Sequence, residues 1–183
     1  SKLLIPVAHV EAGLRSFDRT MPEEVNRLVT DHLADLLFTP SADANENLQR
    51  EGIPPRKIHL VGNVMIDSLV RLLPVAEKYR PEGIPERYAL VTLHRPANVD
   101  VDSSLKSLVD SLLEISRRLP VVFPVHPRTR QRLQKFAIDA SKLLLLDPLP
   151  YWQFLALQRR AALVITDSGG IQEETTYLGV SCL

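Results

Sequence analysis

Residues 163–174, with the sequence LVITDSGGIQEE, have the pattern with the clearest chemical meaning. An apolar, β-branched run predicts a buried strand, and the Asp-Ser-Gly-Gly turn leads into a pattern typical of a helix. A helix that begins at Ser168 would offer unpaired N–H groups to a phosphate, and the two glycines would let the ligand reach the backbone. Glu173 and Glu174 could then accept hydrogen bonds from a ribose. The structural alternative is a Ser168 cap followed by first-turn acids that suit the helix dipole.

Other polar side chains that could take part in chemistry follow other apolar runs. They are His9, Glu11 and Arg15; Glu23 and Glu24; His94 and Arg95; His126 and Arg128; and Asp167. Each has a structural alternative, such as a core role for His9 or, for Glu23, a capping box or an ion pair with Arg27. A metal site is disfavoured because the chain has neither histidines at i, i+4 nor a CxxC motif. A serine hydrolase and a nicotinamide enzyme are disfavoured because GxSxG and GxGxxG are absent.

The composition indicates a globular protein. The 183 residues carry no net charge and 45% of them are hydrophobic, which suffices for a core and argues against nucleic acid as the main partner. No apolar run is long enough to cross a bilayer. One cysteine, Cys182, cannot form an internal disulfide and fits a reducing cytosol. Both ends fall within strand-like runs, so we expect a fragment of a longer protein.

The elements that must position these residues alternate between strands and helices. Strands are expected at residues 3–10, 36–39, 57–61, 88–92, 121–125, 143–146 and 163–166, each followed by a helix. The first helix, from about Pro22, carries an apolar stripe of Val25, Leu28, Val29, His32 and Leu33, and the third is expected to stop at Pro74. This alternation predicts an α/β fold with two Rossmann-like parallel-sheet domains that face a cleft, both incomplete in this chain. The charged segment 77–87 is the expected linker between domains at residues 1–76 and 88–183.

Five motifs occur in the order in which one known family has them. They are HVEAGLR at residues 9–15, MPEEVNR at 21–27, TLHRP at 92–96, PVHP at 124–127 and TDSGGIQEE at 166–174. On these motifs the whole chain resembles the bacterial non-hydrolysing UDP-N-acetylglucosamine 2-epimerases. The resemblance implies a two-domain fold of the glycosyltransferase-B type. It also implies interconversion of UDP-GlcNAc and UDP-ManNAc, by elimination and re-addition of UDP through a 2-acetamidoglucal.

The resemblance further implies a cellular setting and a set of partners. It implies a cytoplasmic homodimer that supplies ManNAc-type sugars for cell-surface polysaccharide, with UDP-GlcNAc as substrate and as activator. It implies no cofactor, neither metal nor nicotinamide, and neither nucleic acid nor membrane as a partner. A phosphate-binding loop and a catalytic aspartate of the family would precede Ser1, and a diphosphate-binding arginine would follow Leu183. We therefore expect this chain alone to be inactive.

The matching motifs carry roles for individual residues. Glu11 and Glu23 match the catalytic glutamates, which move the C2 proton, and His94 matches a catalytic residue beside the diphosphate. The residues that match substrate-binding positions are Ser168, Gly169 and Gly170 for the diphosphate, Glu174 for the ribose and Phe154 for the uracil. Those that match the activator site are Arg95, His126 and Glu24. Leu149 stands where some members have a glutamine near the uracil.

Other functions stay open at this point. An epimerase of another UDP-2-acetamido sugar is the closest alternative. A glycosyltransferase of the same fold would share the nucleotide-binding half, but it gives no reason for the motifs around Glu11 and Glu23. A non-catalytic nucleotide-sugar-binding module would bind UDP-GlcNAc without turnover.

Overall fold

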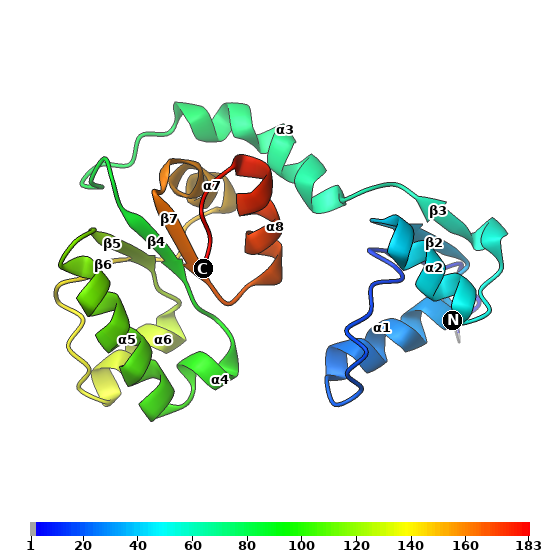
Figure 1. Cartoon of the computed structure of the whole chain (residues 1–183), viewed down its shortest axis with the longest axis horizontal. Helices are drawn as coiled ribbons and strands as arrows, with labels where there is room; N and C mark the ends of the chain where they lie inside the picture. Colours follow the sequence, from blue (N-terminus) through cyan, green and yellow to red (C-terminus); the bar gives the residue numbers. More distant parts are fainter. Residues whose placement is uncertain (1–2) are drawn as a thin grey trace. The chain divides into compact units, whose positions relative to one another are not determined.

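The computed structural model describes residues 3–183 (Figure 1). The chain divides into two compact units, residues 1–67 and residues 68–183. Each unit has its own sheet, in which the paired strands run parallel and a helix lies between successive strands of the chain. The predicted α/β alternation is therefore confirmed, since parallel neighbours require such crossover connections.

The first unit contains a short sheet in the order β1-β2-β3. Its elements are β1 (Ala8–Val10), α1 (Pro22–Leu33), β2 (Leu36–Thr39), α2 (Ala42–Arg50), a 3-10 turn (Pro55–Lys57) and β3 (Ile58–Leu60). The first strand is shorter than the expected residues 3–10, because only Ala8–Val10 pair with β2. A small apolar core, which includes Leu37, Leu48 and Ile53, holds the unit together.

Helix α1 differs from the sequence prediction in the face that it buries. The apolar side chains of Val25, Val29 and Leu33 are 43%, 54% and 63% exposed, whereas Glu24 and Asp31 are buried. The reason is that these two carboxylates accept hydrogen bonds from the loop after β1, and this bonding turns the polar side of α1 inward.

The start of α1 also differs from the predicted capping box. Met21 is the N-cap residue, and its side chain bonds no backbone N–H among residues 3–183. Thr20, which lies three residues before Glu23 at the spacing of a capping box, donates its hydroxyl to Asp18 instead. Pro22 occupies the first turn as predicted, where a missing N–H costs little.

The second unit contains a larger sheet in the order β6-β5-β4-β7. Its elements are α3 (Val64–Lys78, which starts just before the boundary), β4 (Ala89–Thr92), α4 (Pro96–Val99), α5 (Asp102–Ser116), β5 (Val121–Pro124), α6 (Pro127–Lys135), β6 (Leu144–Leu146), α7 (Tyr151–Arg160), β7 (Leu163–Thr166) and α8 (Gly169–Leu178). The chain adds β5 and β6 on one side of β4 and then returns to add β7 on the other. In open α/β sheets, ligands bind beyond the carboxyl ends of strands at such a reversal of strand order.

Apolar side chains cover both faces of this sheet. On β4, Val91 belongs to the cluster that contains Leu105 and Val109 of α5, whereas Leu90 belongs to the cluster that contains Leu157 of α7. This alternation is the period of two that a strand imposes on its side chains. Burial on both faces is typical of a parallel sheet and explains why its strands are almost continuously apolar.

Helix α3 continues through Pro74 to Lys78, past the point at which we expected it to end. Leu69 and Ala76 of α3 form an apolar cluster with Leu155 and Ala156 of α7. This packing offsets the backbone hydrogen bond that a proline removes from a helix. The boundary between the compact units therefore lies at residues 67–68, ahead of the expected linker at 77–87. The domain limits of the full-length protein stay a prediction.

Candidate active site

Glu11 is the first residue after β1 and has a left-handed backbone, with φ of 67°. A residue with a side chain pays about 1–2 kcal/mol for this conformation. Such strain persists only where the surroundings fix the backbone, and residues in this state cluster at functional sites. The contacts of the following loop, residues 11–17, supply that constraint.

Gly13 brings the loop into direct contact with α2. Its φ is 82°, and a Cβ atom at this position would lie 2.4 Å from the carbonyl oxygen of Ala44. The Gly13 N–H donates to Asp31 over 3.1 Å, and the Asn47 amide donates to the Gly13 carbonyl over 3.0 Å. The loop is thus tied to α1 and to α2 through its main chain.

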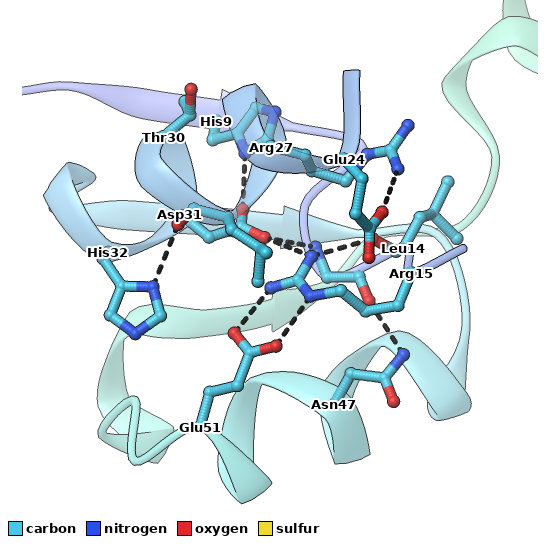
Figure 2. A network of polar contacts seen from close by, with 12 residues as sticks. His9, Leu14, Arg15, Glu24, Arg27, Thr30, Asp31, His32, Asn47 and Glu51 are labelled. Carbon is cyan, nitrogen blue, oxygen red and sulfur yellow. Dashed lines mark hydrogen bonds and ion pairs between the residues drawn. The ribbon is translucent and has the colours of Figure 1, made fainter. Parts of the chain in front are cut away.

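Arg15 and Asp31 form the centre of a buried ionic network (Figure 2). The Arg15 guanidinium donates two bonds of 2.7 Å to the Glu51 carboxylate and lies 2.7 Å from Asp31. Nδ1 of His9 lies 2.5 Å from the other Asp31 oxygen, so the strand before Glu11 is held as well. Hydrogen bonding to Arg15 lowers the pKa of Glu51, and the bond to Glu51 raises the pKa of Arg15. Arg15 and Glu51 therefore stay ionised and paired at neutral pH.

The two acids of the PEE motif differ in their surroundings. Glu24 is buried and accepts bonds from the N–H groups of Ser16 and Phe17, at 3.0 and 3.1 Å. Burial alone would raise the pKa of Glu24, but these bonds outweigh it and the pKa is lowered. Glu23 is exposed in the first turn of α1. Glu23 is therefore open to a ligand, whereas Glu24 holds the Glu11 loop.

In the second unit, Asp167 organises the carboxyl ends of β4 and β7. Its carboxylate accepts bonds from the N–H groups of His94 and Arg95 and from the Asn98 amide, and it lies 2.7 Å from Nδ1 of His94. Burial would raise the pKa of Asp167, but the bonds from Asn98, Arg95 and His94 outweigh it and lower the pKa. The His94 side chain is 61% exposed. An imidazole oriented by a carboxylate and open to ligand can donate a proton or stabilise negative charge.

A pocket of about 240 Å³ lies beside this pair. It is lined by His94, Pro96, Val99, Asp100, His126, Arg128 and Thr129. The structure thus brings together His94, expected at the catalytic site, and His126, expected at the activator site. Arg128 lies on the same wall and forms an ion pair of 2.7 Å with Asp100, which also lines the pocket. Arg95 precedes α4 and has an exposed side chain.

The start of α8, which lies within the TDSGGIQEE motif, offers backbone N–H donors. Ser168 is the N-cap residue, but its side chain caps no N–H of the described chain, so the predicted serine cap is not formed. The Ser168 N–H donates instead to the Thr166 hydroxyl over 3.0 Å. Apart from Gly169 itself, its two chain neighbours and the nearby backbone of α8, no heavy atom of residues 3–183 lies within 4 Å of a Cβ placed on Gly169. The N-terminus of the helix is therefore open to a ligand.

Glu174 lies further along α8 and is buried. Its Oε1 accepts a bond of 2.8 Å from the Tyr151 hydroxyl, while its buried Oε2 has no hydrogen-bond partner in the described part of the chain. Phe154, one turn after Tyr151 on α7, packs in the cluster that also contains Ile171 of α8. A nucleotide-binding surface built by α7 and α8 would use these groups.

Two functional contacts escaped the sequence analysis. Asp167 was a candidate only as a polar residue after a strand, and its bond to the loop after β4 depends on strand order. Tyr151 gave no signal that separated it from core aromatics. Within residues 3–183, no group of three or more histidine, cysteine, aspartate or glutamate side chains is arranged to hold a metal ion.

The family model for UDP-N-acetylglucosamine 2-epimerase matches residues 1–183. The chain belongs to the UDP-N-acetylglucosamine 2-epimerase family. It is 45% identical to the UDP-N-acetylglucosamine 2-epimerase of Methanocaldococcus jannaschii, over all of this chain and 54% of that protein. It is 42% identical to the UDP-2,3-diacetamido-2,3-dideoxy-D-glucuronate 2-epimerase of Pseudomonas aeruginosa, over all of this chain and 52% of that protein. The chain thus spans about half the length of these 2-epimerases.

Solved structures of 2-epimerases agree with the fold. The crystal structure of the Methanocaldococcus jannaschii UDP-GlcNAc 2-epimerase in complex with UDP-GlcNAc and UDP matches with a TM-score of 0.88 and 44% identity, over 99% of this chain and 53% of that chain. The Neisseria meningitidis enzyme bound to UDP-GlcNAc matches with a TM-score of 0.84 and 32% identity, over all of this chain and 53% of that chain. The predicted glycosyltransferase-B type of fold is confirmed. None of the helices in residues 3–183 is both long enough and apolar enough to span a membrane.

Proposed function

We propose that the full-length protein containing this chain is a UDP-GlcNAc 2-epimerase, which interconverts UDP-GlcNAc and UDP-ManNAc. The observation that carries the proposal is the fixed, strained Glu11 at the carboxyl end of β1, in a chain of the 2-epimerase family. A sugar-nucleotide-binding module has no need for an acidic residue whose backbone is held in this way. An enzyme that removes a weakly acidic proton does need it.

The proposed reaction moves one proton and one leaving group. A carboxylate, Glu11 or Glu23, takes the proton from C2, a double bond forms between C1 and C2, and the C1–O bond breaks to release UDP. Return of a proton to the opposite face of C2, with attack of the UDP oxygen on C1, gives the inverted sugar. Two carboxylates are useful because the proton leaves from one face and arrives at the other.

The second unit supplies groups suited to the leaving nucleotide. The N–H groups at the start of α8, near Ser168, Gly169 and Gly170, would bind the diphosphate, and His94 would stabilise the charge that grows as UDP departs. Glu174 would bind the ribose and Phe154 would lie near the uracil. The open face at Gly169 and the orientation of His94 by Asp167 support these roles.

A second UDP-GlcNAc would act as an activator through Arg95 and His126, with Glu24 as a third residue of that site. The pocket that His94 and His126 line supports a ligand site there. The buried bonds of Glu24 indicate that it acts by holding the loop after β1. We further propose that the full-length protein is a cytoplasmic homodimer that supplies ManNAc-type sugars for cell-surface polysaccharide.

A different UDP-2-acetamido sugar is the second candidate substrate. The Pseudomonas aeruginosa relative, at 42% identity, is a 2-epimerase of a UDP-2,3-diacetamido sugar acid. Both substrates share the 2-acetamido group and the UDP moiety, so the same C2 chemistry applies to each. The substituents at C3 and C6 would decide between them.

The test is deuterium incorporation at C2 of each UDP-sugar, followed by NMR with the full-length protein in D₂O. Deuterium at C2 with formation of UDP-ManNAc is the expected result. Turnover of the diacetamido sugar alone would move the assignment to the second candidate. UDP binding with no exchange would leave a binding module, and transfer of the sugar to an acceptor would indicate a glycosyltransferase.

A further inference from the structure

The Glu174 carboxylate is buried but only half satisfied. Tyr151 donates to Oε1, and Oε2 is shielded from solvent without a partner among the described residues. A buried carboxylate oxygen without a donor costs free energy that a hydroxyl donor would recover. The arrangement therefore favours a ligand that brings such a donor to Oε2.

The position of Glu174 on α8 indicates which part of a nucleotide would provide the donor. Glu174 follows Gly169 by five residues, or about 7.5 Å along a helix axis. This is the scale of a ribose with its 5′-phosphate. A diphosphate at the helix N-terminus would thus place a ribose hydroxyl near the carboxylate.

Tyr151 occupies the first position of α7 and is 37% exposed. Burial, followed by the bond to Glu174, raises the pKa of the Tyr151 hydroxyl, so it keeps its proton and acts as a donor. Phe154 lies one turn along the same helix and packs in the cluster that contains Ile171. The hydroxyl is therefore a fixed donor that holds one oxygen of the carboxylate.

We propose that Tyr151 is a positioning residue, which orients the Glu174 carboxylate so that Oε2 accepts a hydrogen bond from a ribose hydroxyl. The inference rests on the proposed use of UDP-sugars. It adds a residue that determines selectivity for ribonucleotides, and it assigns separate tasks to the two oxygens of one carboxylate.

The experiment measures binding of two nucleotides to the full-length Tyr151→Phe variant by calorimetry. UDP affinity should fall about tenfold, the change given by one hydrogen bond of ordinary net strength. Affinity for 2′,3′-dideoxyuridine diphosphate should stay unchanged, because this ligand has no hydroxyl for Glu174. With UDP-GlcNAc, KM should rise while kcat changes little, since the lost contact serves ground state and transition state alike.

Two further variants make the result decisive. Glu174→Gln should show the same selectivity between the two nucleotides, and Tyr177→Phe, on an exposed tyrosine of α8, should bind both as the wild type does. Equal loss of both nucleotides in Tyr151→Phe, or unchanged or tighter UDP binding, would overturn the proposal. If the wild type binds UDP but does not exchange the C2 proton, the proposed epimerase activity is refuted. The effect of Tyr151 on nucleotide binding would still be established independently.

Discussion

The loop after β1 and the loops after β4 and β7 lie at equivalent ends of two parallel sheets, but their polar groups are used differently. In the first loop, the carboxylates of Asp31 and Glu24 are buried, and their oxygens accept bonds from groups of the protein itself. In the second, the His94 ring is exposed and one oxygen of Glu174 has no partner within the described residues. We infer that the first loop is built to fix a reacting group and the second set to receive a ligand.

The Glu11→Gln variant is the strongest test of this difference between the loops. If Glu11 is a base, C2 exchange should fall by a factor on the order of 10²–10⁴, the range for general acid–base catalysis, while UDP affinity stays near that of the wild type. NMR exchange and calorimetry measure the two effects. Glu114→Gln, in an exposed ion pair on α5, is the matched control. Equal losses of rate and affinity would mean that Glu11 binds ligand or holds structure.

Gly13→Ala tests whether the loop is fixed by contact with α2. We expect a loss of about 3 kcal/mol in the free energy of unfolding, because strain at positive φ adds to a clash with the Ala44 carbonyl. Urea denaturation gives the value. Gly52→Ala is the control, since its φ is 83° but, outside Gly52 and its two chain neighbours, no heavy atom of the described chain lies within 4 Å of its added Cβ. A similar loss of unfolding free energy in both variants would show that contact with α2 does not fix the loop.

Asp167→Asn tests whether His94 acts through its carboxylate partner. We expect kcat to fall about 100-fold, because the imidazole loses the charge that orients it. Steady-state kinetics at several pH values would show a shifted profile as well. Asp147→Asn, on an exposed aspartate after β6, should leave the kinetics unchanged. An unchanged profile in Asp167→Asn would make Asp167 a purely structural residue.

The smallest expected effect concerns acid stability. The pKa of Glu24 is lowered in the folded state, so its contribution is present above the ordinary value of 4.5 and is lost as the pH falls through the folded value. Glu24→Gln should therefore be less stable than the wild type at pH 7 and lose less stability on acidification to about pH 3. Denaturation curves across this range provide the measurement. Glu46→Gln, in an exposed pair with Arg50, should keep the wild-type dependence on pH.

The sequence predicted the order of strands and helices along the chain, because the strands are continuous apolar runs and turn residues separate them. The sequence prediction failed where the burial of polar side chains competes with the burial of apolar ones, and where packing overrides a local helix-ending signal. The stripe of Val25 and Val29 looks like a core face, yet loop N–H groups draw Glu24 inward instead. Pro74 looks like a helix end, yet packing of Ala76 on α7 carries α3 past it.

The sequence motifs identified candidate residues for the site, but they did not indicate the contacts that strand order and long-range packing decide. Nothing local in the sequence indicates that Asp167 bonds the backbone after β4, because the two segments are more than seventy residues apart. The pairing of Tyr151 with Glu174 likewise depends on how α7 and α8 pack. Roles for Glu11, Glu23 and Phe154 stay predictions until the variants are measured.

The carbonyl of Ala44 lies where a side chain at position 13 would begin. The main chain of the loop lies directly against the main chain of α2 there, so α2 restricts position 13 to glycine. A directed-evolution library aimed at new sugar substrates would therefore gain nothing from varying position 13. Diversity is better introduced at exposed positions that carry no such steric limit.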